Sequence, residues 1–63
     1  MTPKEINAAR HQLGLSQAGL ARVMGIADDR TIRRWESGET PITGPASLLL
    51  RYMVRYGLPD VAL

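Results

Sequence analysis

The sequence predicts a compact all-α domain of four short helices. Four segments each open on a helix-capping residue and end at a glycine, and apolar residues recur at helical spacing between these signals. The chain has 63 residues, of which 44% are hydrophobic, and this is enough for one modest core. Because it contains no cysteine, packing rather than disulfide bonds must hold the helices together. We therefore expect a single domain over residues 1–63, with a short fifth helix as a variant of the four-helix arrangement.

The first helix is expected over residues 3–13, where Thr2, Pro3 and Glu5 provide the N-cap, the first-turn proline and the acid of a capping box. Its inner face consists of apolar residues at helical spacing, namely Ile6, Ala9 and Leu13. Arg10 lies on that same side of the helix. An unpaired buried charge is costly, so Arg10 requires a partner.

A tight break separates the second and third helices, which are expected over residues 16–24 and 29–37. Ser16 is the expected N-cap of the second helix, and a glycine ends it. Either Asp28 or Asp29 caps the third helix. The residues of the second helix that face the core are Leu20, Val23 and Met24.

Charged residues divide the third helix into two sides. When Ile32 is placed at the centre of the inner face and each residue turns by about 100°, one side contains Trp35, Glu36, Asp28 and Asp29. The other side contains Arg30, Arg33, Arg34 and Ser37. We therefore expect three guanidinium groups to share an exposed face with the acids turned away from them. Trp35 is expected in the core rather than stacked on a base.

A guanidinium group suits phosphate oxygens and the O6/N7 edge of guanine. Together with a sequence pI of about 9.7, the arginine face predicts a helix-turn-helix that binds double-stranded DNA through residues 29–37. Arg30 and Arg34 lie nearest the centre of the outward face and are the predicted base-reading residues. Arg33 lies toward its edge and is predicted to contact phosphate. The alternative is a solvated helix face that pairs with nearby acids.

The fourth helix, expected over residues 45–56, is apolar on two sides. One stripe closes the core with Ala46, Leu49, Leu50 and Met53. The second stripe and the tail need another surface to cover them, and consist of Leu48, Tyr52, Tyr56, Leu58, Val61 and Leu63. A two-fold partner would cover them, so these residues form a predicted homodimer interface. The alternative is a protein-interaction module or an antitoxin that uses the same surface to bind a toxin or another protein.

Several motifs of the chain point to one family. In order, they are Ser16-Gln17, Leu20-Ala21, Gly25-Ile26 and the run Thr31-Ile32-Arg33-Arg34-Trp35-Glu36. By these motifs the chain, from the first helix through the fourth, resembles the phage Cro/repressor-type helix-turn-helix family, also called the XRE family. The resemblance implies a lambda-repressor-like fold. Two departures occur: five residues instead of four separate the turn glycine from Thr31, and Glu39 and threonines occupy a loop that often carries Lys or Arg.

The resemblance implies DNA contacts for individual residues. Base contacts fall at the start of the third helix and one turn further on, on Asp29, Arg30 and Arg34. Phosphate contacts implied by the resemblance or by an outward position are Gln17, Thr31, Arg33, Ser37, Thr40 and Thr43. An ordinary role at the helix start is the alternative for Gln17. The resemblance also implies an ion pair between Arg10 and Glu36, two charges that helical spacing already turns inward.

No other chemistry is predicted from these residues. The one histidine, His11, lies on an outer side of the first helix, and neither an acid–base constellation nor a Gly-rich phosphate loop is present. We expect no enzyme activity, no catalytic residue, no metal ligand and no cofactor. Apolar runs are too short for a membrane span or a secretory signal. The sequence therefore predicts a cytoplasmic transcriptional regulator, most simply a repressor that binds an inverted-repeat operator as a homodimer.

Overall fold

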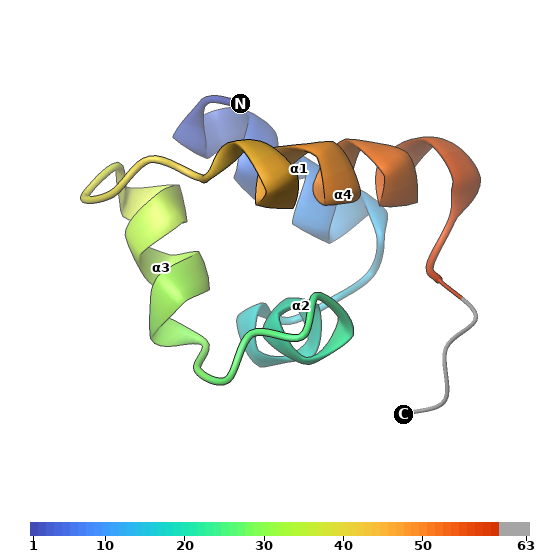
Figure 1. Ribbon diagram of the computed structural model, residues 1–63, viewed down its shortest axis with the longest axis horizontal. Helices are drawn as coiled ribbons and strands as arrows, with labels where there is room; N and C mark the ends of the chain where they lie inside the picture. Colours follow the sequence, from blue (N-terminus) through green and yellow to red (C-terminus); the bar gives the residue numbers. More distant parts are fainter. Residues whose placement is uncertain (60–63) are drawn as a thin grey trace.

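The computed structural model describes residues 1–59, and these residues form four α-helices (Figure 1). The helices are α1 (Pro3–Gln12), α2 (Gln17–Val23), α3 (Arg30–Ser37) and α4 (Gly44–Tyr56). The predicted all-α, four-helix fold is confirmed. No fifth helix occurs among residues 1–59, and Val61 and Leu63 of the predicted dimer interface lie outside the described part of the chain.

The helices begin and end where local chemistry requires it. Thr2 Oγ1 accepts a hydrogen bond from the Glu5 amide at 3.1 Å, and Glu5 Oε1 accepts one from the Thr2 amide at 2.7 Å. These two bonds form a complete capping box at the start of α1. At the end of α3, Gly38 has a φ of 82°, a left-handed conformation that costs least for glycine. The chain reverses there, and the following loop leads into α4 (Figure 1).

The N-cap of α2 explains the glycine within that helix. The Ser16 hydroxyl accepts a hydrogen bond from the Gly19 amide at 2.9 Å. A Cβ atom on residue 19 would lie only 3.2 Å from Ser16 Oγ and 3.5 Å from a Leu15 methyl group. Gly19 therefore lowers helix propensity but leaves room for the cap.

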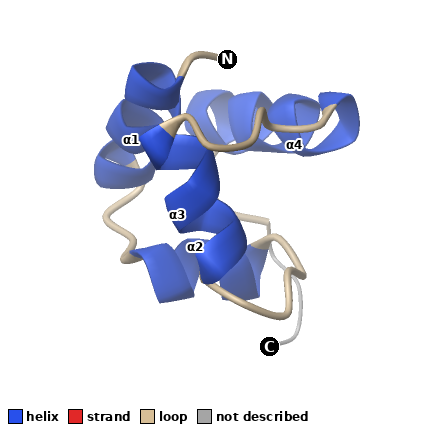
Figure 2. Cartoon of the chain, turned by 90° about the vertical axis from the view of Figure 1, so that its left-hand side faces the viewer, coloured by secondary structure: helices blue, strands red, loops and turns tan. Residues whose placement is uncertain are grey.

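The core is built from side chains of all four helices. The most deeply buried are Ile6, Leu20, Ile32, Leu50 and Met53. α1 packs against both α3 and α4, and α2 packs against α3. Figure 2 shows α3 in front, running from α1 down to α2. Trp35 is only 5% exposed and belongs to this core, as predicted.

The core fixes which side of α3 faces outward. Ile32 and Trp35 anchor its inner side, so the opposite side of the helix faces solvent. Within residues 1–59, the helices are too short and too polar for any of them to cross a lipid bilayer. Metal-ligating side chains do not gather in groups of three or more in this part of the chain.

Candidate nucleic-acid interface

The carboxylate of Glu36 ties the end of α3 to α1 and α2. Arg10 donates to it twice, from Nε to Oε2 at 2.7 Å and from Nη2 to Oε1 at 3.1 Å. Asn7 Nδ2 donates to Oε1 at 2.8 Å, and Arg10 Nη1 reaches the Leu15 carbonyl oxygen at 3.0 Å. The expected ion pair between Arg10 and Glu36 is thus present, and it is part of a larger network. This network holds the recognition-helix candidate α3 in a defined orientation on α1.

Burial and hydrogen bonding act in opposite directions on these two groups. Burial raises the pKa of the Glu36 carboxyl, but the hydrogen bonds from Arg10 and Asn7 and the charge of Arg10 outweigh it. The pKa of Glu36 therefore lies below its ordinary value. The hydrogen bond to Glu36 likewise raises the pKa of Arg10. Both groups are charged in the folded protein at neutral pH.

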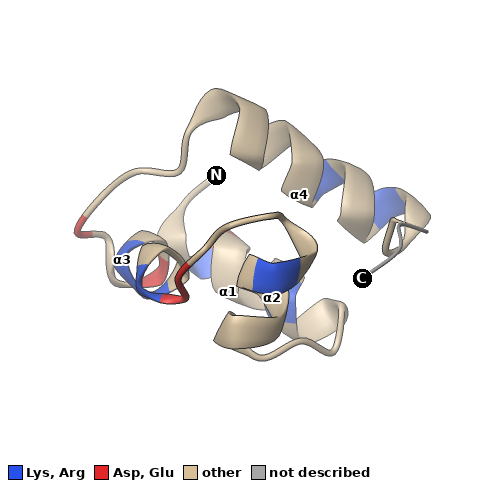
Figure 3. Ribbon diagram, turned by 60° about the horizontal axis from the view of Figure 1, so that its bottom comes forward, with Lys and Arg blue, Asp and Glu red and all other residues tan. Residues whose placement is uncertain are grey.

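The outer side of α3 carries the three arginines that the sequence predicts there. Arg30, Arg33 and Arg34 have side chains that are 66%, 55% and 55% exposed. Within residues 1–59, these side chains are therefore open to solvent rather than packed under another helix. Figure 3 shows basic and acidic segments next to one another on α3 and on the loops that flank it.

Each of these arginines pairs with a carboxylate, contrary to our expectation that the acids turn away. The distances are 3.2 Å from Arg30 Nη2 to Asp28 Oδ2, 3.6 Å from Arg33 Nη2 to Asp29 Oδ1, and 3.1 Å from Arg34 Nε to Glu39 Oε2. The expectation was correct for Glu36 and wrong for Asp28 and Asp29. Exposed pairs of this kind contribute about 0–1 kcal/mol each to folding stability, so they matter little for the fold itself.

The error has a geometric cause. Asp28 precedes the helix and its backbone is not helical, so the regular turn per residue does not apply to it. Asp29 and Arg33 are four residues apart and are therefore neighbours on the helix surface. Glu39 follows Gly38, where the chain reverses, and its amide donates to the Arg34 carbonyl oxygen at 3.0 Å. A helical projection of α3 could therefore predict the pair of Asp29 and Arg33 but not the pairs that Asp28 and Glu39 form.

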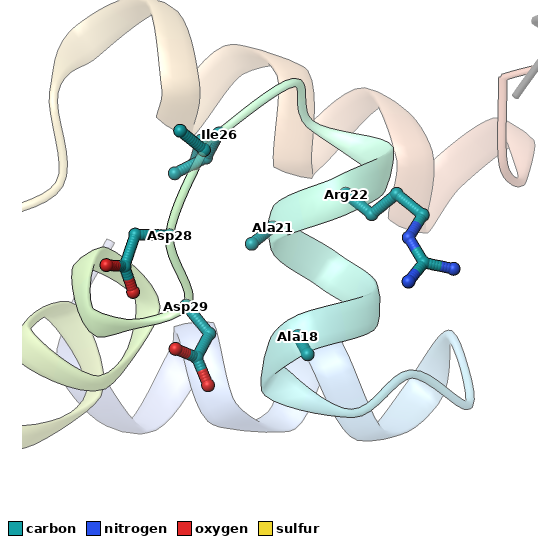
Figure 4. Close-up of a pocket in the computed structure, with 7 residues that line it drawn as sticks. Ala18, Ala21, Arg22, Ile26, Asp28 and Asp29 are labelled. Atoms are coloured by element: carbon teal, nitrogen blue, oxygen red, sulfur yellow. The ribbon is translucent and has the colours of Figure 1, made fainter.

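In the turn between α2 and α3, the side chain of Asp28, and not that of Asp29, accepts a hydrogen bond from the first amide of α3. Asp29 occupies the N-cap position but makes no side-chain cap hydrogen bond, whereas Asp28 Oδ1 accepts from the Arg30 amide at 2.9 Å. The two acids line an open groove of about 460 Å³ between this turn and the small side chains Ala18 and Ala21 of α2 (Figure 4). In this view the side chain of Arg22 points away from both carboxylates.

Gln17 lies in the first turn of α2 and is partly buried. Its Nε2 atom donates to Glu36 Oε1 at 3.4 Å. The sequence predicts a phosphate contact for Gln17, and the amide group is here oriented by the same carboxylate that binds Arg10. Asn7 and Gln17 are the members of this network that sequence reasoning missed. Asn7 could have been found, because it lies three residues before Arg10 on the same helix face.

The hydroxyl groups predicted to contact phosphate differ in whether they already form hydrogen bonds within the protein. Ser37 Oγ already donates to the Arg34 carbonyl oxygen at 3.1 Å. Thr43 Oγ1 accepts from the Ala46 amide at 3.4 Å and so caps α4, which leaves its hydroxyl hydrogen available as a donor. Thr40 is exposed, and Thr31 is half-buried. The Thr40 amide is used internally, since it donates to the Arg34 carbonyl oxygen at 3.3 Å.

A second exposed surface lies on α4, away from the core. Leu48, Tyr52, Tyr56 and Leu58 are 69%, 56%, 65% and 47% exposed. The rings of Tyr52 and Tyr56 lie 4.8 Å apart between centroids, and the guanidinium of Arg55 lies over the Tyr56 ring. We refer to Leu48, Tyr52, Tyr56 and Leu58 as the α4 apolar face.

Comparison with known proteins adds one match. A family model described as a helix-turn-helix domain matches residues 5–63. The match covers α2, α3 and α4 completely and nearly all of α1. Searches of curated proteins and of solved structures found no significant match.

Proposed function

The chain belongs to the helix-turn-helix domain family, and from this premise we propose that it is a sequence-specific regulator of transcription that binds double-stranded DNA. The observation that carries the proposal is the position of Arg30, Arg33 and Arg34 on the exposed side of α3. Ile32 and Trp35 hold the other side of α3 in the core. A short helix anchored in this way can enter a major groove without rearrangement of the fold.

Within this proposal, α3 is the recognition helix and its residues divide by role. Arg30 and Arg34 read base edges, and each contact with guanine is worth about 1–3 kcal/mol of discrimination. Asp29, at the start of the helix, is the third proposed base contact, because a carboxylate accepts a hydrogen bond from the N4 amino group of cytosine. All three side chains are exposed or partly exposed, as such contacts require.

The proposed phosphate contacts come from α2, from α3 and from the segment between α3 and α4. Arg33 contributes from the edge of α3, and the remaining proposed contacts are Gln17, Thr31, Ser37, Thr40 and Thr43. Phosphate contacts of this kind position a protein on the duplex without selecting its sequence. Ser37 must exchange its hydrogen bond to the Arg34 carbonyl oxygen for one to phosphate.

A homodimer places two copies of α3 in successive major grooves, about 34–36 Å apart, on an inverted-repeat operator. The α4 apolar face supports this part of the proposal, because two tyrosines and two leucines are exposed together on one helix and its C-terminal end. A single domain of this size would bury little DNA surface and bind weakly. Occupation of an operator would then repress transcription from the promoter that contains it.

Selection of bound sequences from random duplexes tests the proposal. We expect an enriched palindrome for the parent protein and loss of that preference for Arg30→Ala/Arg34→Ala. Lys4→Ala/Arg51→Ala is the matched control, since it removes two exposed positive charges from α1 and α4. Absence of any enriched sequence with the parent protein, or equal selectivity of the Arg30/Arg34 variant, would contradict the proposal.

A further inference from the structure

The two arginines proposed to read bases are each held by a carboxylate from outside the helix. Asp28 Oδ2 accepts from Arg30 Nε at 3.3 Å and lies 3.2 Å from Arg30 Nη2, and Glu39 Oε2 lies 3.1 Å from Arg34 Nε. We propose that Asp28 and Glu39 are specificity-determining residues, which orient these guanidinium groups toward bases and disfavour contacts with phosphate. The inference rests on the proposed DNA-binding function and adds two residues to it.

The first reason for this proposal is the edge of the guanidinium group that each acid contacts. A guanidinium group has five N–H donors on a planar fork. Asp28 takes the side edge of Arg30, formed by Nε and Nη2, and Glu39 contacts Arg34 through Nε. The end edge, formed by Nη1 and the outer hydrogen of Nη2, points away from the acid. Guanine requires two parallel N–H donors for O6 and N7, and this end edge supplies them while the acid stays in place.

Arg33 provides a contrast within the same helix. Its Nη2 atom lies 3.6 Å from Asp29 Oδ1, which is longer than a hydrogen bond. The contact also uses a terminal nitrogen rather than Nε, so it leaves Arg33 free to turn. The arginine proposed for phosphate is thus loosely held, whereas the two proposed for bases are hydrogen-bonded or closely paired through Nε.

A backbone hydrogen bond holds the carboxylate of Asp28, and another holds the main chain of Glu39. Asp28 Oδ1 accepts from the Arg30 amide at 2.9 Å, and this hydrogen bond lowers the pKa of Asp28. Glu39 follows the left-handed Gly38, and its amide donates to the Arg34 carbonyl oxygen at 3.0 Å. Each carboxylate therefore starts from a backbone position set by the same helix that carries its arginine.

These contacts affect specific and non-specific binding differently. Non-specific binding depends almost wholly on attraction between basic side chains and phosphates. A phosphate that approaches Arg30 or Arg34 meets a neighbouring carboxylate of like charge and must displace it. A guanine base is neutral and occupies the free end edge, so the acid can remain. Asp28 and Glu39 therefore weaken binding to random DNA more than binding to the cognate sequence.

The test compares the affinity for the selected duplex with the affinity for a scrambled duplex at one salt concentration. Asp28→Asn keeps the oxygen that caps the Arg30 amide, and Glu39→Gln changes an exposed loop residue, so both variants should fold. We expect tighter binding to the scrambled duplex and a fall of about tenfold in the specificity ratio of the double variant. Glu5→Gln, on α1, is the matched control for Asp28→Asn and for Glu39→Gln taken singly, because each of the three removes one negative charge and glutamine preserves the capping box.

The outcomes separate this inference from the proposed function. An unchanged ratio in Asp28→Asn/Glu39→Gln, with a parent protein that still selects a sequence, would overturn the inference alone. A parent protein without sequence preference would overturn the proposed function as well. As an independent readout, the Nε–H resonance of Arg30, which donates to Asp28 Oδ2 at 3.3 Å, should remain hydrogen-bonded in the cognate complex of the parent. It should lose this signature in Asp28→Asn, where an amide nitrogen replaces the accepting oxygen. An Nε–H group that is released on cognate binding in the parent would also overturn the inference.

Discussion

Arg10 and Glu36 lie 26 positions apart in the sequence, and their side chains meet at 2.7 Å between Nε and Oε2. Their side chains are only 12% and 8% exposed. The pair joins α1 to the last turn of α3, directly beneath the exposed arginine face. Since Asn7 and Gln17 donate to the same carboxylate, the orientation of α3 and that of a proposed phosphate contact depend on one group.

Replacement of Arg10 by methionine should destabilise the fold strongly. The Arg10→Met variant leaves the part-buried carboxylate of Glu36 without its main partner, although Asn7 and Gln17 still donate to it. We therefore expect a loss of at most about 3–5 kcal/mol of unfolding free energy. Urea unfolding of parent and variant measures this difference. Arg10→Met/Glu36→Met is the control and should recover much of the stability, because neither charge is left unpaired. A loss below about 1 kcal/mol for Arg10→Met would contradict the interpretation of the pair as buried.

Stability should decline at acidic pH. The pKa values of Glu36, Asp28 and Glu5 are all lower in the folded protein than their ordinary values. The unfolded chain therefore takes up protons first, below about pH 4.3, so the stabilisation is complete above this pH and is lost as the pH falls through the folded-state pKa values. Urea unfolding between pH 7 and 3 measures the slope. Glu36→Gln should show a shallower acid decline, and an equal decline in parent and variant would exclude Glu36 as a source.

A methyl group at position 19 should fail to stabilise α2. Gly-to-Ala exchange within a helix normally gains up to about 1 kcal/mol. In Gly19→Ala the new Cβ presses on Ser16 Oγ at 3.2 Å and disturbs the N-cap, so we expect no gain in unfolding free energy. In a Ser16→Gly background the contact disappears, and the same exchange should stabilise the protein. A full gain in the parent background would show that the cap does not explain Gly19.

Salt dependence should distinguish phosphate contacts from base contacts. A dimer that neutralises about 6 phosphates gives a slope near −5 for log K against log salt concentration. Arg33→Ala should reduce the slope by about 2 per dimer and weaken all duplexes alike. Arg34→Ala should instead relax base preference at one position of each half-site. Titrations of selected and scrambled duplexes at several salt concentrations would show reversed roles if the assignment is wrong.

The α4 apolar face should control oligomeric state. Tyr52→Ser/Tyr56→Ser removes the two exposed rings, and sedimentation should show a shift from dimer to monomer. The affinity for a palindromic operator should fall while the affinity for a single half-site stays unchanged. Arg51→Ala, an exposed change on the same helix, is the control. A variant that remains dimeric would place the interface elsewhere.

Local chemistry explains why much of the fold could be predicted. Capping residues and glycines act on neighbouring backbone groups. Thr2 therefore predicts a helix start and Gly38 a helix end from local sequence alone. Helical periodicity likewise places Ile32 and Trp35 inside and the three arginines of α3 outside. These features depend only on residues within a few positions of one another.

Apart from the Arg10–Glu36 pair, which the family resemblance implied, the contacts between distant side chains were not predicted from the sequence. The convergence of Asn7 and Gln17 on Glu36 requires three helices to meet, and no spacing along one helix contains that distance. The pairing of Asp28 and Glu39 with arginines depends on non-helical backbone on either side of α3. The sequence by itself determined four helices, their ends and the face that each one buries, because these follow from short-range hydrogen bonds and periodic burial. Only the tertiary structure decided that Asp28 and Glu39 pair with Arg30 and Arg34, because the Coulomb energy between two side chains depends on their separation in space and not on their separation along the chain.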